Sequence, residues 1–133
     1  MALSEYLRGV IMKRILLVDD EPNIVKLVAA RLKANGYEVI SAYDGQEALE
    51  TARRVKPDLI ILDLMLPKMS GYKVCGLLKG DSRFAKIPII IFTARAQEED
   101  VKLGGELGAE AYVTKPFDSK MLLSKIKELL KQP

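Results

Sequence analysis

Acidic side chains directly follow two apolar runs in this sequence. Asp19 and Asp20 come after Ile15-Leu16-Leu17-Val18, and Asp63 comes after Leu59-Ile60-Ile61-Leu62. Carboxylates held close together raise each other's pKa and oppose ionisation unless a cation neutralises them. A hard cation such as Mg²⁺ prefers all-oxygen ligands of this kind. The acids therefore predict a Mg²⁺ site, provided that the two runs are neighbouring strands.

Two further apolar runs end in polar groups of a different kind. Ile89-Ile90-Ile91-Phe92 leads to Thr93, and Ala111-Tyr112-Val113-Thr114 leads to Lys115. A hydroxyl and an ammonium group can donate hydrogen bonds and positive charge to the oxygens of a phosphoryl group. Acids, a hydroxyl and an amine at four strand ends predict a site that handles phosphoryl groups.

Composition narrows the class of protein. A chain of 133 residues, 49% hydrophobic and 29% charged, fits one compact domain. The sequence contains no histidine, which excludes imidazole metal ligands, Ser-His and Cys-His nucleophile pairs and a phosphohistidine carrier. Cys75 is the single cysteine, so no internal disulfide is expected. Its apolar neighbours predict a buried, structural thiol.

Charge and hydropathy exclude other partners. The net charge of +3 is small, and the basic residues are not interleaved with aromatics, so direct binding to nucleic acid is not expected. The apolar stretches are too short to span a membrane, and Glu5 and Arg8 interrupt any signal-peptide pattern. A cytoplasmic location is therefore expected.

Apolar runs alternate with segments of helical periodicity, which is typical of repeated βαβ units. Five strands and five helices are expected. The helices are expected to begin near Pro22, Asp44, Tyr72, Gln97 and Asp118, and the strand not yet named spans about Glu38 to Ser41. The continuous apolar strands predict a doubly wound parallel sheet with helices on both faces. In the flavodoxin-like strand order 2-1-3-4-5, strands 1 and 3 are neighbours, which would bring Asp19, Asp20 and Asp63 together.

These motifs together resemble the receiver domain of bacterial two-component response regulators. The resemblance covers residues 13 to 131 and includes the segments Val18-Asp19-Asp20-Glu21, Asp63-Leu64-Met65-Leu66-Pro67 with Gly71, Thr93-Ala94 and Lys115-Pro116-Phe117. It implies that Asp63 accepts a phosphoryl group from a histidine kinase or a histidine phosphotransfer protein. It also implies a phosphoacceptor signalling domain, not an enzyme, with at most self-catalysed phosphotransfer and slow autodephosphorylation.

The resemblance assigns a role to each candidate residue. The Mg²⁺ ligands would be Asp20 and Asp63 directly, Asp19 through water, and the backbone carbonyl of Met65. Thr93 would hydrogen-bond to the phosphoryl group, Lys115 would pair with its charge, and Tyr112 would turn inward on activation. Arg95 and Met65 would tune hydrolysis of the phosphoryl group. The output surface would comprise the fourth helix, the fifth strand and the last helix. It would act on a downstream protein or output domain, and a phosphorylation-dependent dimer is compatible with this arrangement.

Other interpretations compete with this one. The acids after the first strand suit the N-terminus of a helix through its dipole, without any metal. A phosphohydrolase of the haloacid dehalogenase type would need a second aspartate where Met65 stands, and a pseudo-receiver need not retain the whole set of site residues. A flavin or dinucleotide protein would need glycines after the first strand.

Some positions depart from the usual receiver pattern. Glu110-Ala111 and Ser70 stand where aspartates are common, although neither position carries the chemistry. Residues 1 to 11 lie outside the resemblance and are expected to form an N-terminal extension, and the receiver domain is expected to span residues 12 to 133. The apolar spacing in residues 3 to 11 fits a short amphipathic helix. The competing interpretation is a non-native extension or an alternative start.

Overall fold

The chain folds into a five-stranded sheet with helices on both faces. The computed structural model describes residues 12–94, 102, 105–116 and 118–132. The elements in chain order are β1 (Arg14–Val18), α2 (Pro22–Ala34), β2 (Glu38–Ala42), α3 (Gly45–Val55), β3 (Leu59–Leu62), α4 (Gly71–Lys79), β4 (Ile89–Thr93), β5 (Ala111–Thr114) and α6 (Ser119–Leu129).

The sheet has the predicted topology. Its strand order is β2-β1-β3-β4-β5, and every neighbouring pair is parallel. Val18 of β1 lies opposite Leu62 of β3, so the residues that follow these two strands emerge side by side. Strand β1 lies between β2 and β3, which makes the carboxyl ends of β1 and β3 the point where the order of the strands reverses.

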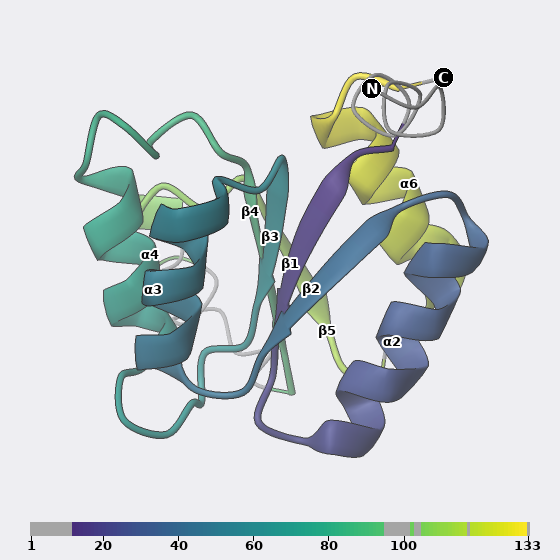
Figure 1. Cartoon of the computed structure of the whole chain (residues 1–133), viewed down its shortest axis with the longest axis horizontal. Helices are drawn as coiled ribbons and strands as arrows, with labels where there is room; N and C mark the ends of the chain where they lie inside the picture. The colour runs from purple at the N-terminus through teal and green to yellow at the C-terminus, as the bar shows by residue number, and fades with distance from the viewer. Residues whose placement is uncertain (1–11, 95–101, 103–104, 117, 133) are drawn as a thin grey trace, which may run out of the picture.

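Two hydrophobic layers form because successive strand residues point to opposite faces. Leu16 and Ile60 pack under α3 and α4, whereas Leu17 and Ile61 pack under α2 and α6. In Figure 1, α3 and α4 cover one face of the sheet, and α2 and α6 cover the other. The central strands β1, β3 and β4 are therefore buried on both sides, as their uninterrupted apolar sequences predicted.

The helix boundaries follow local signals. Pro22 occupies the first turn of α2. Asp44 caps α3 by accepting a hydrogen bond from the backbone N–H of Glu47, and Asp118 caps α6 in the same way from Lys120 and Met121. Helix α4 begins at Gly71, one residue before the predicted Tyr72, because the Ser70 hydroxyl accepts from the N–H of Lys73 and caps the helix there.

Some sequence predictions need adjustment or fall outside the described residues. Strand β2 ends at Ala42 and not at Ser41, because Ala42 pairs with Val18 across the sheet. The fourth predicted helix, Gln97 to Leu103, lies outside the described residues apart from Lys102. No helix among the described residues has both the length and the apolar character to cross a membrane.

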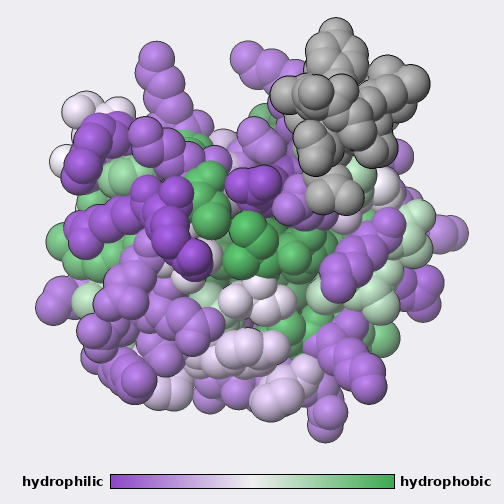
Figure 2. Space-filling model, in the orientation of Figure 1, coloured by the Kyte–Doolittle hydropathy of each residue, from purple (hydrophilic) through white to green (hydrophobic). Residues whose placement is uncertain are grey.

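The edge strand β2 is less covered than the central strands. Its first four residues are only partly buried. Figure 2 shows a hydrophobic area over β2 in the middle of this face, flanked by hydrophilic side chains. This area lies along the strand, whereas the polar residues at the strand ends lie at the carboxyl edge of the sheet.

Candidate phosphoryl-acceptor site

Backbone hydrogen bonds place two acids next to each other at the carboxyl edge of the sheet. The N–H of Asp63 donates to the carbonyl of Val18 (3.0 Å), and the N–H of Asp19 donates to the carbonyl of Ala42 (3.2 Å). These bonds continue the parallel ladders one residue beyond the strands. Asp19 and Asp63 are buried, with 0% and 4% of their surface exposed, whereas Asp20 is exposed.

Lys115 connects these acids. Its ammonium group pairs with Asp19 and lies 3.1 Å from Oδ2 of Asp63. The backbone N–H of Lys115 donates to the carbonyl of Thr93 (2.9 Å), which fixes the start of the lysine stem beside β4. The ammonium also lies 5.3 Å from the centre of the Phe92 ring. Groups that follow β1, β3 and β5 therefore meet at one point. Of the three acids predicted to come together, Asp19 and Asp63 share Lys115, whereas Asp20 lies exposed beside Asp19.

The electrostatics of the site favour a positively charged lysine. Burial alone would lower the pKa of Lys115, but its hydrogen bond to Asp19 and the negative charges of Asp63 and Asp19 outweigh burial and raise that pKa. Burial also raises the pKa of Asp19, despite its hydrogen bonds from Lys115 and from the Glu21 N–H. One ammonium group thus pairs with two buried carboxylates, so the site carries more negative than positive charge.

The donor set fits a divalent cation. Carboxylate oxygens of Asp19, Asp20 and Glu21 lie within 4.8 Å of one another. Asp63 is outside that group and is joined to Asp19 through Lys115. A hard cation with oxygen ligands would neutralise the charge that Lys115 leaves uncompensated. In the sequence, Glu21 stood out only as part of the acidic motif, but its carboxylate lies close enough to those of Asp19 and Asp20 to contribute.

The loop after β3 holds the remaining predicted ligand. The N–H of Met65 donates to Oδ1 of Asp63 at 3.3 Å, and the Met65 side chain is exposed. A Cβ atom on Gly71 would lie 2.0 Å from the carbonyl oxygen of Asp63, which is far closer than real Cβ atoms approach. Glycine at position 71 therefore allows the start of α4 to pack directly against the backbone of Asp63.

The two predicted switch residues lie on the adjacent strands β4 and β5. Thr93 ends β4 and is buried, with 1% of its surface exposed. Tyr112 of β5 lies opposite Ile91 of β4. Its side chain is partly buried and packs against the hydrophobic cluster beneath α3 and α4. Arg95, the predicted tuning residue, lies outside the described residues. Thr93 pairs with Thr114, the residue before Lys115, so it lies at the same carboxyl edge of the sheet as the acids.

Glu110 lies at the opposite edge of the sheet and has a structural environment. Its carboxylate accepts a hydrogen bond from the N–H of Ile89 (2.6 Å) and pairs with Lys79. The Lys79 ammonium also donates to the carbonyls of Ala85 (3.0 Å) and Ile87 (2.8 Å). The sequence does not predict this cluster, because its members are brought together only by the packing of α4 against the β4 and β5 strands.

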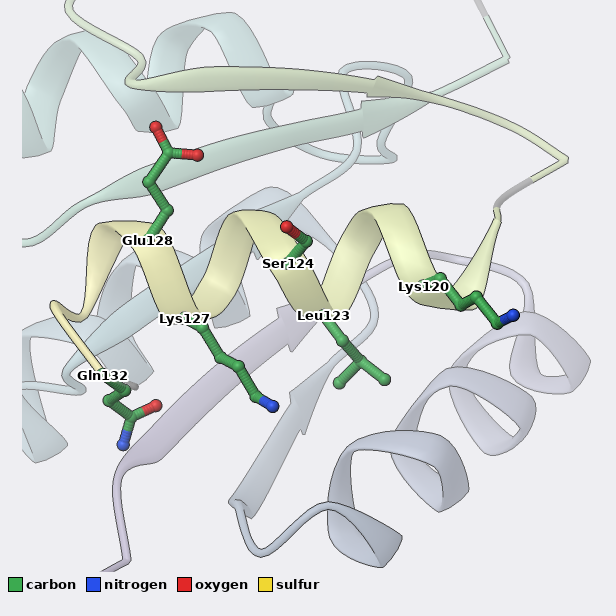
Figure 3. Close-up of a pocket in the computed structure, with 6 residues that line it drawn as sticks. All are labelled: Lys120, Leu123, Ser124, Lys127, Glu128 and Gln132. Carbon is green, nitrogen blue, oxygen red and sulfur yellow. The ribbon is translucent and has the colours of Figure 1, made fainter.

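A separate hollow on α6 lacks a comparable set of groups. Its volume is about 530 Å³, and it is lined by Lys120, Leu123, Ser124, Lys127, Glu128 and Gln132. In Figure 3, Leu123 and Lys127 lie on one side of the helix, whereas Ser124 and Glu128 lie on the other. The side chains diverge from the helix and do not converge on one ligand. The carboxyl edge of the sheet is therefore the better candidate for chemistry.

Comparison with known proteins assigns the family. The response regulator receiver domain family matches residues 15–127. The chain belongs to this family, whose members are phosphoacceptor signalling domains and not classical enzymes. This finding confirms the resemblance seen in the sequence and disfavours the haloacid dehalogenase and flavin alternatives.

The chain is also similar in sequence to individual curated proteins. It is 47% identical over 120 residues to the alkaline phosphatase synthesis transcriptional regulatory protein PhoP of Bacillus subtilis, covering 90% of this chain and 49% of that protein. It is 45% identical over 121 residues to the DNA-binding dual master transcriptional regulator RpaA of Synechocystis, covering 91% of this chain and 50% of that protein. The chain thus spans about half the length of these curated relatives.

Solved structures agree in fold. The receiver domain protein from Methanospirillum hungatei aligns with a TM-score of 0.85 at 32% identity, covering 90% of this chain and 94% of that one. The chemotaxis response regulator CheY4 of Vibrio cholerae aligns with a TM-score of 0.83 at 33% identity, covering 89% of this chain and 98% of that one. The predicted flavodoxin-like order of strands is therefore confirmed.

Proposed function

We propose that Asp63 is the residue that accepts the phosphoryl group in this receiver domain. The observation that carries this assignment is its position at the end of β3, where it is buried and lies 3.1 Å from the Lys115 ammonium. An oxygen of the Asp63 carboxylate attacks phosphorus, and the bond from phosphorus to the donor nitrogen or oxygen breaks. The leaving group is the donor's histidine side chain, or acetate when acetyl phosphate is used, and the product is an acyl phosphate.

The surrounding charges offset the repulsion between two reacting anions. Lys115 supplies a fixed positive charge beside the attacking carboxylate and beside the phosphoryl oxygens in the product. Mg²⁺, held by Asp19, Asp20, Asp63 and the Met65 carbonyl, would supply further positive charge when bound. The excess negative charge of the acidic cluster supports this requirement. The chain itself mainly holds charged groups in position.

Phosphorylation would then shift a population of conformations through Thr93 and Lys115. Moving a two-state equilibrium from 1:99 to 99:1 requires about 5.5 kcal/mol. A hydrogen bond to a charged group contributes about 1.5–3 kcal/mol, so two such bonds approach the required free energy and one does not. Tyr112 would respond on the neighbouring strand, and the output surface would include β5 and α6.

The proposed partners follow from this assignment. A histidine kinase or histidine phosphotransfer protein would donate the phosphoryl group in the cytoplasm. The named relatives PhoP and RpaA are transcriptional regulators, the latter DNA-binding. We expect this domain to act on such an output through protein contacts, including a phosphorylation-dependent dimer, and not to bind nucleic acid itself.

The direct test is labelling by acetyl phosphate, followed by intact-protein mass spectrometry. We expect one phosphoryl addition that requires Mg²⁺ and is abolished in Asp63→Asn. Asp58→Asn is the matched control, because Asp58 is an exposed aspartate that precedes the same strand at its other end. Labelling of Asp63→Asn at the wild-type rate, or labelling that persists in excess chelator, would overturn the assignment.

A further inference from the structure

The turn between β2 and α3 packs against the loop that carries Asp63 and Met65. The N–H of Gly45 donates to the carbonyl of Pro67 (3.2 Å). The carboxylate of Asp44 pairs with the ammonium of Lys68 at 3.5 Å. Both of these contacts are made to the loop that follows Asp63.

The approach of Gly45 to the loop is too close for any side chain. A Cβ atom at this position would lie 1.8 Å from the carbonyl oxygen of Met69 and 2.6 Å from its carbonyl carbon. Both are backbone atoms, so no side-chain rotation can relieve the contact. A residue other than glycine would push the loop by roughly 1 Å or more, because packed atoms cannot overlap.

The same loop is held at two places. Gly71, its last residue, lies against the Asp63 carbonyl at its start and donates its N–H to the carbonyl of Leu64 (2.9 Å). Further along, Lys68 has a left-handed backbone with φ of 67° and is paired with Asp44. The loop from position 63 to 71 is therefore fixed from α4 on one side and from the β2–α3 turn on the other.

We infer that Gly45, supported by Asp44, is a positioning residue for the phosphoacceptor loop. It holds the loop so that the Asp63 carboxylate and the Met65 carbonyl keep the spacing that a cation and a phosphoryl group require. Mg²⁺ tolerates little departure from octahedral geometry, and a displacement of about 1 Å in a reacting group can reduce a rate by up to about 100-fold. This inference rests on the proposed function of Asp63.

The test compares Gly45→Ala with a matched glycine substitution. Gly105→Ala is the control, because a Cβ atom there meets no atom within 4 Å. Acetyl phosphate labelling is measured over a range of Mg²⁺ concentrations, and hydrogen exchange of the loop amides is measured without metal. For Gly45→Ala we expect the Mg²⁺ concentration for half-maximal rate to rise roughly tenfold and exchange at Leu64 to Gly71 to accelerate, with Gly105→Ala like wild type.

A milder variant covers the case in which Gly45→Ala does not fold. Asp44→Ser keeps an N-cap for α3 but removes the charge that pairs with Lys68. We expect a smaller rise in the Mg²⁺ requirement, roughly twofold to threefold, and faster exchange of the same loop amides, without a change in the thermal midpoint. If a folded Gly45→Ala, or Asp44→Ser in its place, shows wild-type exchange and the wild-type Mg²⁺ requirement, the inference is wrong.

The outcomes separate this inference from the proposed function. If wild type is not labelled at all, the assignment of Asp63 fails. If wild type and Gly105→Ala are labelled but the variants of the turn behave identically to them, only the positioning role fails. Faster loop exchange with an unchanged Mg²⁺ requirement would also overturn the inference, since the contact would then be structural without affecting the site.

Discussion

Replacing Lys115 with methionine would remove the ammonium group that lies between two buried carboxylates. The side chains of Lys115, Asp19 and Asp63 are 11%, 0% and 6% exposed, respectively. Methionine is also unbranched and keeps most of the apolar stem near the Phe92 ring, so the change is chiefly one of charge. Lys115→Met therefore measures how much the Lys115 ammonium, paired with the two carboxylates, contributes to the free energy of unfolding.

The expected loss of stability is large. Removing one partner of a buried ion pair costs about 3–5 kcal/mol, because the remaining charge is left uncompensated. We expect Lys115→Met to lower the free energy of unfolding by about this amount in the presence of a chelator. A cation bound by the same acids would replace part of the lost charge. The acids should bind Mg²⁺ more tightly once the competing ammonium is gone. Because a ligand at 100 times its Kd stabilises a folded protein by about 2.7 kcal/mol and by more as Kd falls, saturating Mg²⁺ should stabilise the variant more than wild type and reduce the loss.

Urea denaturation followed by circular dichroism measures both effects. Wild type, Lys115→Met and Lys86→Met are compared with chelator and with saturating MgCl₂; Lys86 is an exposed lysine and controls for the change of residue type. A loss below about 1 kcal/mol in chelator would refute the claim that Lys115 neutralises buried carboxylates. A loss of the same size in both conditions would refute the claim that Mg²⁺ and Lys115 act on one acidic cluster.

Two further predictions concern switching and pH. Thr93→Ala should still be labelled at Asp63, since neither nucleophile nor metal ligand is lost. Its NMR shift changes around Tyr112 on adding beryllofluoride, a phosphoryl mimic, should be smaller than in wild type, and a full wild-type response would exclude Thr93 as the coupling residue. Burial raises the pKa of the Cys75 thiol to about 11 from 9.0. The folded state therefore keeps a proton that the unfolded state loses, and between pH 9 and 11 this group lowers stability by at most about 1.4 kcal/mol per pH unit as pH rises. The stability of wild type relative to Cys75→Ala, measured by urea denaturation, should fall across this window, whereas a constant difference would contradict the raised pKa.

Local sequence signals determined most of the elements. The apolar runs at Leu59–Leu62 and Ile89–Thr93 form central strands. A strand covered on both faces buries every side chain, so an uninterrupted apolar run predicts it. The caps at Asp44 and Asp118 were readable because a cap depends on residues only two or three positions away. The proximity of Asp19 and Asp63 could be predicted from the sequence once a parallel sheet with the order 2-1-3-4-5 was assumed, because strands 1 and 3 are neighbours in that order.

Contacts between loops were decided only by the tertiary structure. The sequence predicted a lysine near the acids, but only the packed sheet shows its ammonium pairing with Asp19 as well as Asp63. Gly45 has an ordinary sequence context, and its need for glycine arises from the Met69 backbone of another loop. Similarly, Glu110 and Lys79 are 31 positions apart and meet because α4 packs beside β5. Periodicity and capping act between near neighbours in the chain, whereas these contacts depend on strand register and helix packing, which no short segment contains.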